Sequence, residues 1–450
     1  MFGTSVALSI FYYCVPRLIR HMKTESKPSL LEQLKEACRD GDVDKYFTLK
    51  ERDNSLLSAY VDKNGWSLLH HAAYGGSEII FKDLLEQKDF DIHKKTKSSK
   101  TVLHIAAKEG RKEICRLIID NTEYENLLDM KNDKDMNAGH IAARYGQTDI
   151  IEMLMKTRCD LLEKVGPLLE NIAIFACKGR SLETMTFIGS HQNLKVALHE
   201  KNYQGWNVAH YAAKSGNCEI LEYLIAEEGV DCINESTDEK KNCLHTACEN
   251  GHYEACKCLI KNNSGLLHLR DINRNHAGHY AAKNGNITII KYLKDQGLDL
   301  ELTNKENVNI LHISCLHAHL ELFKYLAKEF PRLLNQKSNK SKNAVLFVMQ
   351  RKDDEDKRIK ILSYLVNRGL DVYHVPASGK SALYLACKNR AYSLCEHLLK
   401  NYPKFYDIDE GDLTAIEAAD NDSRIKVLFS KYDPKHKTSS RYVEKICIIL

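Results

Sequence analysis

Cysteine and histidine are the residues of this chain whose types and spacing could support chemistry, and they are densest between positions 243 and 258. Thiolate and imidazole groups are the usual ligands of zinc, so this stretch is a candidate metal site. Its six candidate ligands are Cys243, His245, Cys248, His252, Cys256 and Cys258. In a helix, however, Cys256 and Cys258 point to different faces, so the six side chains do not converge on one ion. The sequence therefore predicts no metal site.

Motifs for catalysis are missing from the sequence as well. It contains no glycine-rich phosphate loop and no nucleophile motif. We therefore expect no catalytic residue, no bound cofactor and no enzymatic activity.

A different kind of chemistry is indicated at the end of the chain, where Cys447-Ile448-Ile449-Leu450 forms a C-a-a-X box. Such a box directs a prenyltransferase to its cysteine, and a final leucine favours a covalent geranylgeranyl group. One lipid chain holds a protein only marginally at a membrane, and nearby positive charge is the usual second signal. The basic residues beside the box are Lys435, Lys437, Arg441 and Lys445. We expect residues 434–450 to be a flexible tail on an anionic membrane surface, which makes the protein cytoplasmic and peripheral on the cytosolic face.

The N-terminal segment, residues 1–28, combines an apolar run from Val6 to Val15 with basic residues after it. The run is too short for an ordinary transmembrane helix. A signal peptide has its basic residues before the apolar run, so that interpretation is not favoured either. We expect a frayed or interfacial helix here.

Between these two ends, one pattern recurs: a histidine, any residue, two small residues, and a glycine three residues later. Adjacent copies are separated by 33 to 36 residues, and one interval of 70 residues holds a degenerate copy in which Ile174 takes the histidine position. The histidines are His70, His104, His140, His210, His245, His279 and His312. A period of about 33 residues with two short helices is the ankyrin signature, and the chain resembles the ankyrin-repeat family. The resemblance implies an all-α solenoid of about ten or eleven stacked helix-turn-helix units with short hairpin tips, spanning residues 29–433.

Each copy contains its own start and stop signals. The residue three before the histidine, such as Thr101 or Asn242, has a side chain that can accept a hydrogen bond from the first helical turn. The glycine, such as Gly110, ends the first helix in the left-handed conformation. One repeat departs from the pattern, because a charge run from Arg351 to Arg358 replaces its helix junction. We expect that run to be a solvated loop or a helix extension.

Four cysteines stand where the motif has its second alanine: Cys177, Cys248, Cys315 and Cys387. A buried cysteine behaves as a small hydrophobe, so these thiols are expected to be structural. Such usage is typical of reduced cysteines in a reducing compartment.

The family resemblance also implies that hairpin tips and the face of the first helices bind protein partners. The position four after the histidine is basic in seven of ten repeats, which predicts a basic ladder and an acidic partner. Two alternatives remain. The cations could be ordinary solvent-exposed surface residues, and Trp66 and Trp206 could pack against the next hairpin instead of binding a partner. The tentative partner-binding residues are Trp66, Tyr74, Lys108, Arg144, Lys178, Trp206, Lys214 and Lys283.

Two functions fit these patterns. The first is a protein–protein interaction scaffold, or adaptor, tethered to a membrane. The second is the N-terminal ankyrin region of a TRPA-type ion channel, although no bundle of apolar 20-residue segments follows the repeats. The net charge of +4 over 450 residues is nearly balanced, so nucleic acid is not an expected partner.

Overall fold

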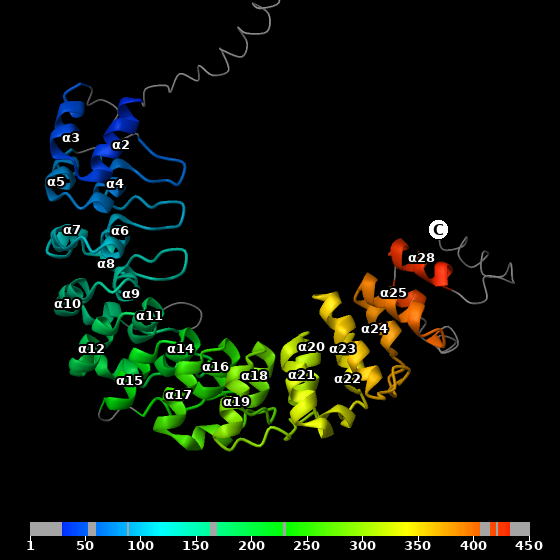
Figure 1. The fold of residues 1–450 in the computed structure, drawn as a ribbon. Helices are drawn as coiled ribbons and strands as arrows, with labels where there is room; N and C mark the ends of the chain where they lie inside the picture. The colour runs from blue at the N-terminus through cyan, green and yellow to red at the C-terminus, as the bar shows by residue number, and fades with distance from the viewer. Residues whose placement is uncertain are drawn as a thin grey trace, which may run out of the picture. The chain divides into compact units, whose positions relative to one another are not determined.

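The computed structural model describes residues 29–52, 60–87, 90–162, 169–227, 231–405, 415–419 and 422–432. Within these ranges every regular element is a helix, which confirms the predicted all-α class (Figure 1). None of the helices in the described ranges has both the length and the apolar character needed to span a bilayer. The segment 1–28, Cys447 and the basic residues Lys435, Lys437, Arg441 and Lys445 lie outside the described residues.

The chain divides into two compact units, residues 1–184 and 185–450, and the helix that contains the boundary is α12 (Leu182–Ser190). The first unit contains α2 (Leu30–Asp40), α3 (Val43–Lys50), α4 (Leu68–Gly75), α5 (Glu78–Glu86), α6 (Val102–Glu109), α7 (Lys112–Ile119), η1 (Thr122–Tyr124), α8 (Asn126–Asp129), α9 (Ala138–Arg144), α10 (Thr148–Thr157), η2 (Cys159–Leu162) and α11 (Ile172–Gly179).

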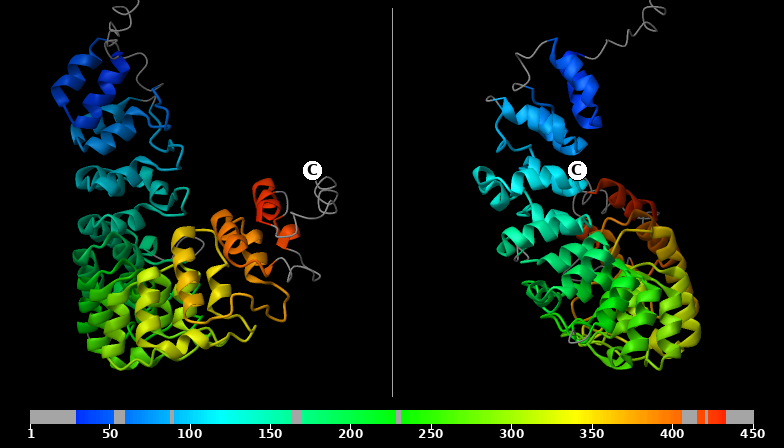
Figure 2. Two further views of the ribbon diagram at one scale, coloured as in Figure 1. Left: turned by 45° about the vertical axis from the view of Figure 1, so that its right-hand side comes forward. Right: turned by 90° about the vertical axis from the view of Figure 1, so that its left-hand side faces the viewer.

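The second unit contains α13 (Gln192–Lys195), η3 (Val196–Leu198), α14 (Val208–Ser215), α15 (Cys218–Ala226), α16 (Cys243–Asn250), α17 (Tyr253–Asn262), η4 (Ser264–His268), α18 (Ala277–Asn284), α19 (Ile287–Asp295), α20 (Ile310–Leu316), α21 (Leu320–Glu329), η5 (Pro331–Asn335), α22 (Ala344–Val348), α23 (Glu355–Asn367), α24 (Ala382–Lys388), α25 (Tyr392–Asn401), α27 (Ala415–Ala418) and α28 (Ser423–Tyr432). Within each unit the helices stack pair upon pair, so that first helices such as α14, α16 and α18 are neighbours (Figures 1 and 2).

The helix boundaries follow from the local sequence. The side chain of Asn242 accepts a hydrogen bond from the backbone N–H of His245, and Thr101 does the same for His104, which confirms the predicted caps. Gly110 follows α6 with φ 69°, in the left-handed region where glycine is favoured. His276 caps α18 in the same way, since its Nδ1 accepts from the N–H of Gly278 at 3.1 Å. The sequence pattern missed this cap because histidine is not among the usual capping residues.

In five repeats the motif histidine bonds a carbonyl of the next repeat through its Nε2 atom; these are His104, His210, His245, His279 and His312. The Nδ1 atom of His245 accepts a hydrogen bond from the backbone N–H of Asn242 at 3.2 Å, and its Nε2 donates to the carbonyl of Leu269 at 3.1 Å. Consecutive hairpins also pair directly, as where the N–H of Ile272 donates to the carbonyl of Glu239 at 2.9 Å. Each repeat therefore supplies polar partners that its neighbour needs, in addition to the apolar surface that they share.

The charge run from Arg351 to Arg358 corrects one expectation. Residues 351–354 are exposed, but Arg358 lies in α23 with its side chain fully buried. Its guanidinium donates to the carbonyls of Val348 at 2.7 Å and Leu316 at 2.9 Å, and it pairs with Asp353 at 2.6 Å. These carbonyls are at the C-terminal ends of α22 and α20, which lack the usual capping glycine. Arg358 therefore acts as a shared C-cap, not as a solvated surface residue.

Candidate interaction surface

The eight tentative partner-binding residues are divided between the two units, so they are described as two sets. The first unit holds Trp66, Tyr74, Lys108, Arg144 and Lys178, and the second holds Trp206, Lys214 and Lys283.

In the first unit, several of these side chains already have partners. The Trp66 ring packs on His71 with centroids 5.1 Å apart, and Tyr74 lies beneath the guanidinium of Arg39 at 4.9 Å. Lys108 pairs with Glu109 at 2.5 Å, and Lys178 pairs with Glu170 at 2.5 Å. Arg144 is half-buried at the end of α9. Because carboxylates neutralise two of these three cations, this part of the basic ladder carries less free charge than its sequence suggests.

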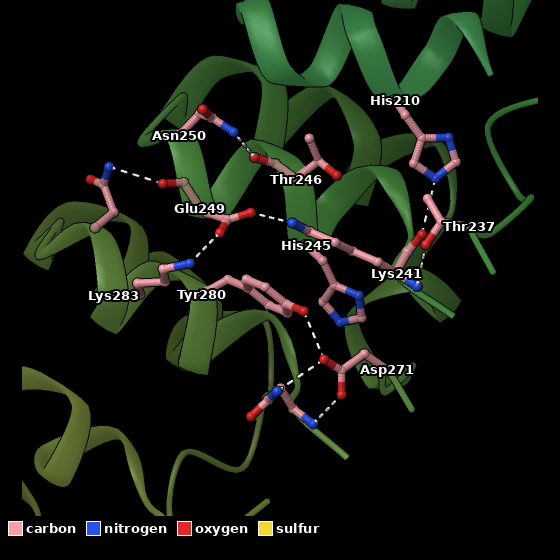
Figure 3. Close-up of polar contacts among 12 residues, drawn as sticks. His210, Thr237, Lys241, His245, Thr246, Glu249, Asn250, Asp271, Tyr280 and Lys283 are labelled. Carbon is pink, nitrogen blue, oxygen red and sulfur yellow. Dashed lines mark hydrogen bonds and ion pairs between the residues drawn. The ribbon is translucent and has the colours of Figure 1, made fainter. Parts of the chain in front are cut away.

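In the second unit, lysines lie against aromatic rings on the face formed by α14, α16, α18 and the hairpins before them. Figure 3 shows Lys241, Lys283 and Tyr280 of this face. The Lys214 ammonium lies 5.4 Å from the centre of the half-buried Trp206 ring. Lys241, which directly precedes the cap of α16, lies 5.8 Å from the Trp206 ring and 4.7 Å from the Tyr280 ring. An ammonium between two ring faces is held by attraction to both π systems. Lys241 is therefore a fixed cation, with only 10% of its side chain exposed.

Glu249 links this cation to a second lysine. Its carboxylate pairs with Lys241 through one oxygen and with Lys283 through the other, the latter at 2.6 Å (Figure 3). Partial burial opposes ionisation of Glu249, but the hydrogen bonds and charges of the two lysines outweigh that effect and lower its pKa. The carboxylate is thus held ionised between cations from two different repeats.

The Tyr280 ring is oriented by the hairpin before α18. Its hydroxyl donates to the Asp271 carboxylate at 2.7 Å, and that carboxylate also accepts from the N–H groups of Asn273 at 2.8 Å and Asn275 at 2.7 Å. Burial and the nearby Asp271 raise the pKa of Tyr280, so the hydroxyl remains a donor.

We call Trp206, Lys214, Lys241, Glu249, Tyr280 and Lys283 the ladder cluster.

Sequence reasoning identified only part of the ladder cluster. It listed Trp206, Lys214 and Lys283 as tentative partner-binding residues, but it did not select Lys241, Glu249 or Tyr280. Tyr280 stands one residue after the motif histidine, and this position faces the same side of the helix as the basic ladder. An aromatic residue at this position could therefore have been recognised from the sequence as part of the surface. The Lys241 contacts depend on neighbouring repeats and carried no local signal.

The zinc candidates do not form a site. Among the described residues, no three histidine, cysteine or acidic side chains are arranged to hold a metal ion. Cys248 and Cys256 are in contact, with their sulfurs 3.6 Å apart, and both are buried and free. Burial raises the pKa of the Cys248 thiol well above its usual value, which keeps it protonated and unreactive.

Comparison with known proteins decides what kind of repeat this is. A sequence model described as "Ankyrin repeats (3 copies)" matches overlapping segments: residues 34–129, 69–165, 140–236, 172–271, 226–304, 244–337 and 278–372. The chain belongs to the ankyrin-repeat family. Ankyrin repeats are generally non-enzymatic modules for protein–protein interaction, and this role follows for the matched segments.

Individual relatives are more distant. The chain is 26% identical to mouse Synphilin-1 over 27% of its own length and 13% of the relative's. It is 23% identical to the chicken nuclear factor NF-kappa-B p105 subunit over 46% of its length and 21% of the relative's. It is 23% identical to human transient receptor potential cation channel subfamily A member 1 over 66% of its length and 26% of the relative's. The ankyrin matches thus span about a quarter or less of each of these relatives.

Proposed function

We propose that the protein is an adaptor that binds an acidic protein partner on the ladder-cluster face of its second unit. The observation that supports this most is a pair of exposed cations, Lys214 and Lys283, which occupy equivalent positions in two repeats. The first helices that carry them also lie beside the aromatic residues Trp206 and Tyr280. Half-buried aromatic rings and exposed basic groups on one face of a repeat array suit protein recognition, since tryptophan and tyrosine are enriched at energetically important contacts. The same groups give no catalytic constellation.

We propose also that the adaptor is peripheral on the cytosolic face of a membrane. The support is the C-terminal sequence alone: Cys447 in a C-a-a-X box, with Lys435, Lys437, Arg441 and Lys445 beside it. A geranylgeranyl chain and a basic segment would each add affinity for an anionic membrane. Lipid on Cys447 would place the bound partner near that surface.

A second candidate function is favoured by one comparison. The similarity to the human TRPA channel covers 66% of this chain, so the repeats could serve as the ankyrin region of a channel-type protein. Mass spectrometry of the native C-terminal peptide separates the two candidates. Removal of the last three residues and a lipid on Cys447 would favour the adaptor, and an unmodified cysteine in a longer product would favour the channel.

The binding face can be tested by site-specific photo-cross-linking in cells. A photoreactive residue at Lys214, on the first-helix face, is expected to capture a discrete protein partner. The matched control is the same residue at Lys291, which is exposed on α19, a second helix. Equal capture at both positions, or none at either, would contradict the proposed face.

A further inference from the structure

The ladder cluster has the composition of an anion-binding site that is occupied by its own chain. We infer that Lys241 and Lys283 form a carboxylate-binding site in which Glu249 stands in for an acidic side chain of a partner peptide. Binding would exchange the Glu249 carboxylate for that of the partner. This inference rests on the proposed function and names the group that the face recognises.

Glu249 stands at an unusual position for an acidic residue in this chain. The equivalent position is basic in seven of ten repeats, and Glu249 is the single acidic residue among the ten. The Glu249 carboxylate lies between two lysines of the ladder cluster. Lys241 comes from the hairpin of the same repeat, and Lys283 comes from the next repeat. Removing its negative charge would leave two neighbouring cations without a counter-ion, which is the arrangement that binds carboxylates.

The two lysines are already positioned to bind an anion, and one of them can be reached from solvent. Lys241 is fixed between the rings of Trp206 and Tyr280, so little side-chain freedom is lost when it binds an anion. Lys283 has 51% of its side chain exposed, so a group from solvent can reach it. The Glu249–Lys283 pair is partly exposed, so breaking it costs little stability. The Lys241–Glu249 pair is more buried, and the carboxylate of the partner would have to replace Glu249 beside Lys241 so that this lysine is not left unpaired.

Apolar side chains are exposed on the hairpins near the two lysines. The hairpin that carries Trp206 also exposes Tyr203, and the hairpin that carries Asp271 exposes Ile272, with 60% and 54% of these residues accessible. Apolar side chains at the tips and cations on the helices suit a peptide that combines acidic and apolar residues. The expected occupant is therefore an acidic peptide segment of a partner protein.

The test measures binding of a fluorescein-labelled decaglutamate peptide to the full chain by fluorescence anisotropy. The Glu249→Gln variant is expected to bind this probe about tenfold more tightly than wild type at low salt, because both lysines become available. The matched control is Glu329→Gln, which removes the same charge from an ion pair with Lys294 on the second helices. Equal gains in the two variants would show a bulk charge effect and overturn the inference.

A second variant keeps the test decisive. Adding Lys283→Gln to Glu249→Gln is expected to abolish most of the gain, whereas adding Lys294→Gln is not. If Glu249→Gln does not fold by circular dichroism, Lys283→Gln alone is used, because its side chain is exposed. That variant must weaken probe binding about threefold relative to Lys294→Gln, and an unchanged affinity would overturn the inference.

The remaining outcomes separate the possible sources of the anion. Binding of Glu249→Gln to phosphatidylserine vesicles but not to decaglutamate would overturn the assignment to a peptide. If Lys214 still cross-links a partner while Glu249→Gln leaves probe affinity unchanged, the carboxylate site is wrong and the adaptor function stands. Failure of the cross-link at Lys214 would instead contradict the proposed function itself.

Discussion

Mild acid should strongly destabilise the second unit. Four motif histidines are buried in this unit, and the Nε2 of each donates to a carbonyl of the next hairpin at 3.0 to 3.1 Å. Burial lowers the pKa of each imidazole to about 4. These histidines are His210, His245, His279 and His312.

The sign of the effect follows from the two states. In the folded protein the imidazoles stay neutral, whereas in the unfolded chain they titrate near ~6.5. The stabilisation is therefore fully present above pH 6.5 and is lost as the pH falls from 6.5 towards 4. At pH 5.5 each histidine costs about 1.4 kcal/mol of stability relative to pH 7.5. For four histidines the loss is roughly 5 to 6 kcal/mol, against a total stability of roughly 5 to 15 kcal/mol for an ordinary domain.

The assay is urea unfolding followed by circular dichroism at pH 7.5, 6.5 and 5.5. The urea midpoint is expected to fall steeply over this range, which lies above the titration of ordinary carboxylates. In His245→Gln the stability at pH 7.5 should decrease, because the bond to the Leu269 carbonyl is lost, but the further loss down to pH 5.5 should be smaller by about 1.4 kcal/mol. The control His268→Gln, at an exposed position, should keep the full pH dependence. A midpoint that is constant from pH 7.5 to 5.5 would refute the reasoning.

Three further predictions concern other parts of the chain. Arg358→Met should lower the free energy of unfolding by about 3 to 5 kcal/mol, because it leaves the carbonyls of two helix ends without a donor. The control Arg368→Met, at the exposed end of α23, should change the free energy of unfolding by less than about 1 kcal/mol. Urea titration of both variants checks this. Cys248→Ala should leave the melting temperature nearly unchanged, since alanine is the usual residue of the motif there, and a chelator should not lower it; a loss restored by zinc would contradict this. Cys447→Ser should move the protein from the membrane to the soluble fraction on centrifugation, and neutralising the upstream cations should weaken membrane binding without preventing lipidation. Those cations are Lys435, Lys437 and Arg441. A Cys447→Ser protein that stays on membranes would place the anchor elsewhere in the chain.

The repeat architecture could be predicted because its determinants are local. The caps Thr101 and Asn242, the left-handed Gly110 and the buried Cys248 each act within one repeat, and the period of the motif fixes how the repeats follow one another. In a solenoid each unit contacts mainly its neighbours, so a pattern that specifies one unit specifies most of the fold.

The distribution of charge could not be predicted in the same way. The sequence gives the types of Lys241, Glu249 and Lys283, but only stacking brings Lys283 to a carboxylate 34 residues earlier in the chain. Arg358 looks like part of a solvated charge run until its guanidinium is placed against carbonyls of two other helices. Local sequence determines where a helix begins and ends, because those hydrogen bonds are made within a few residues. Whether a charge is free, paired or buried depends on atoms contributed by other repeats, and only the tertiary structure of this protein decides that.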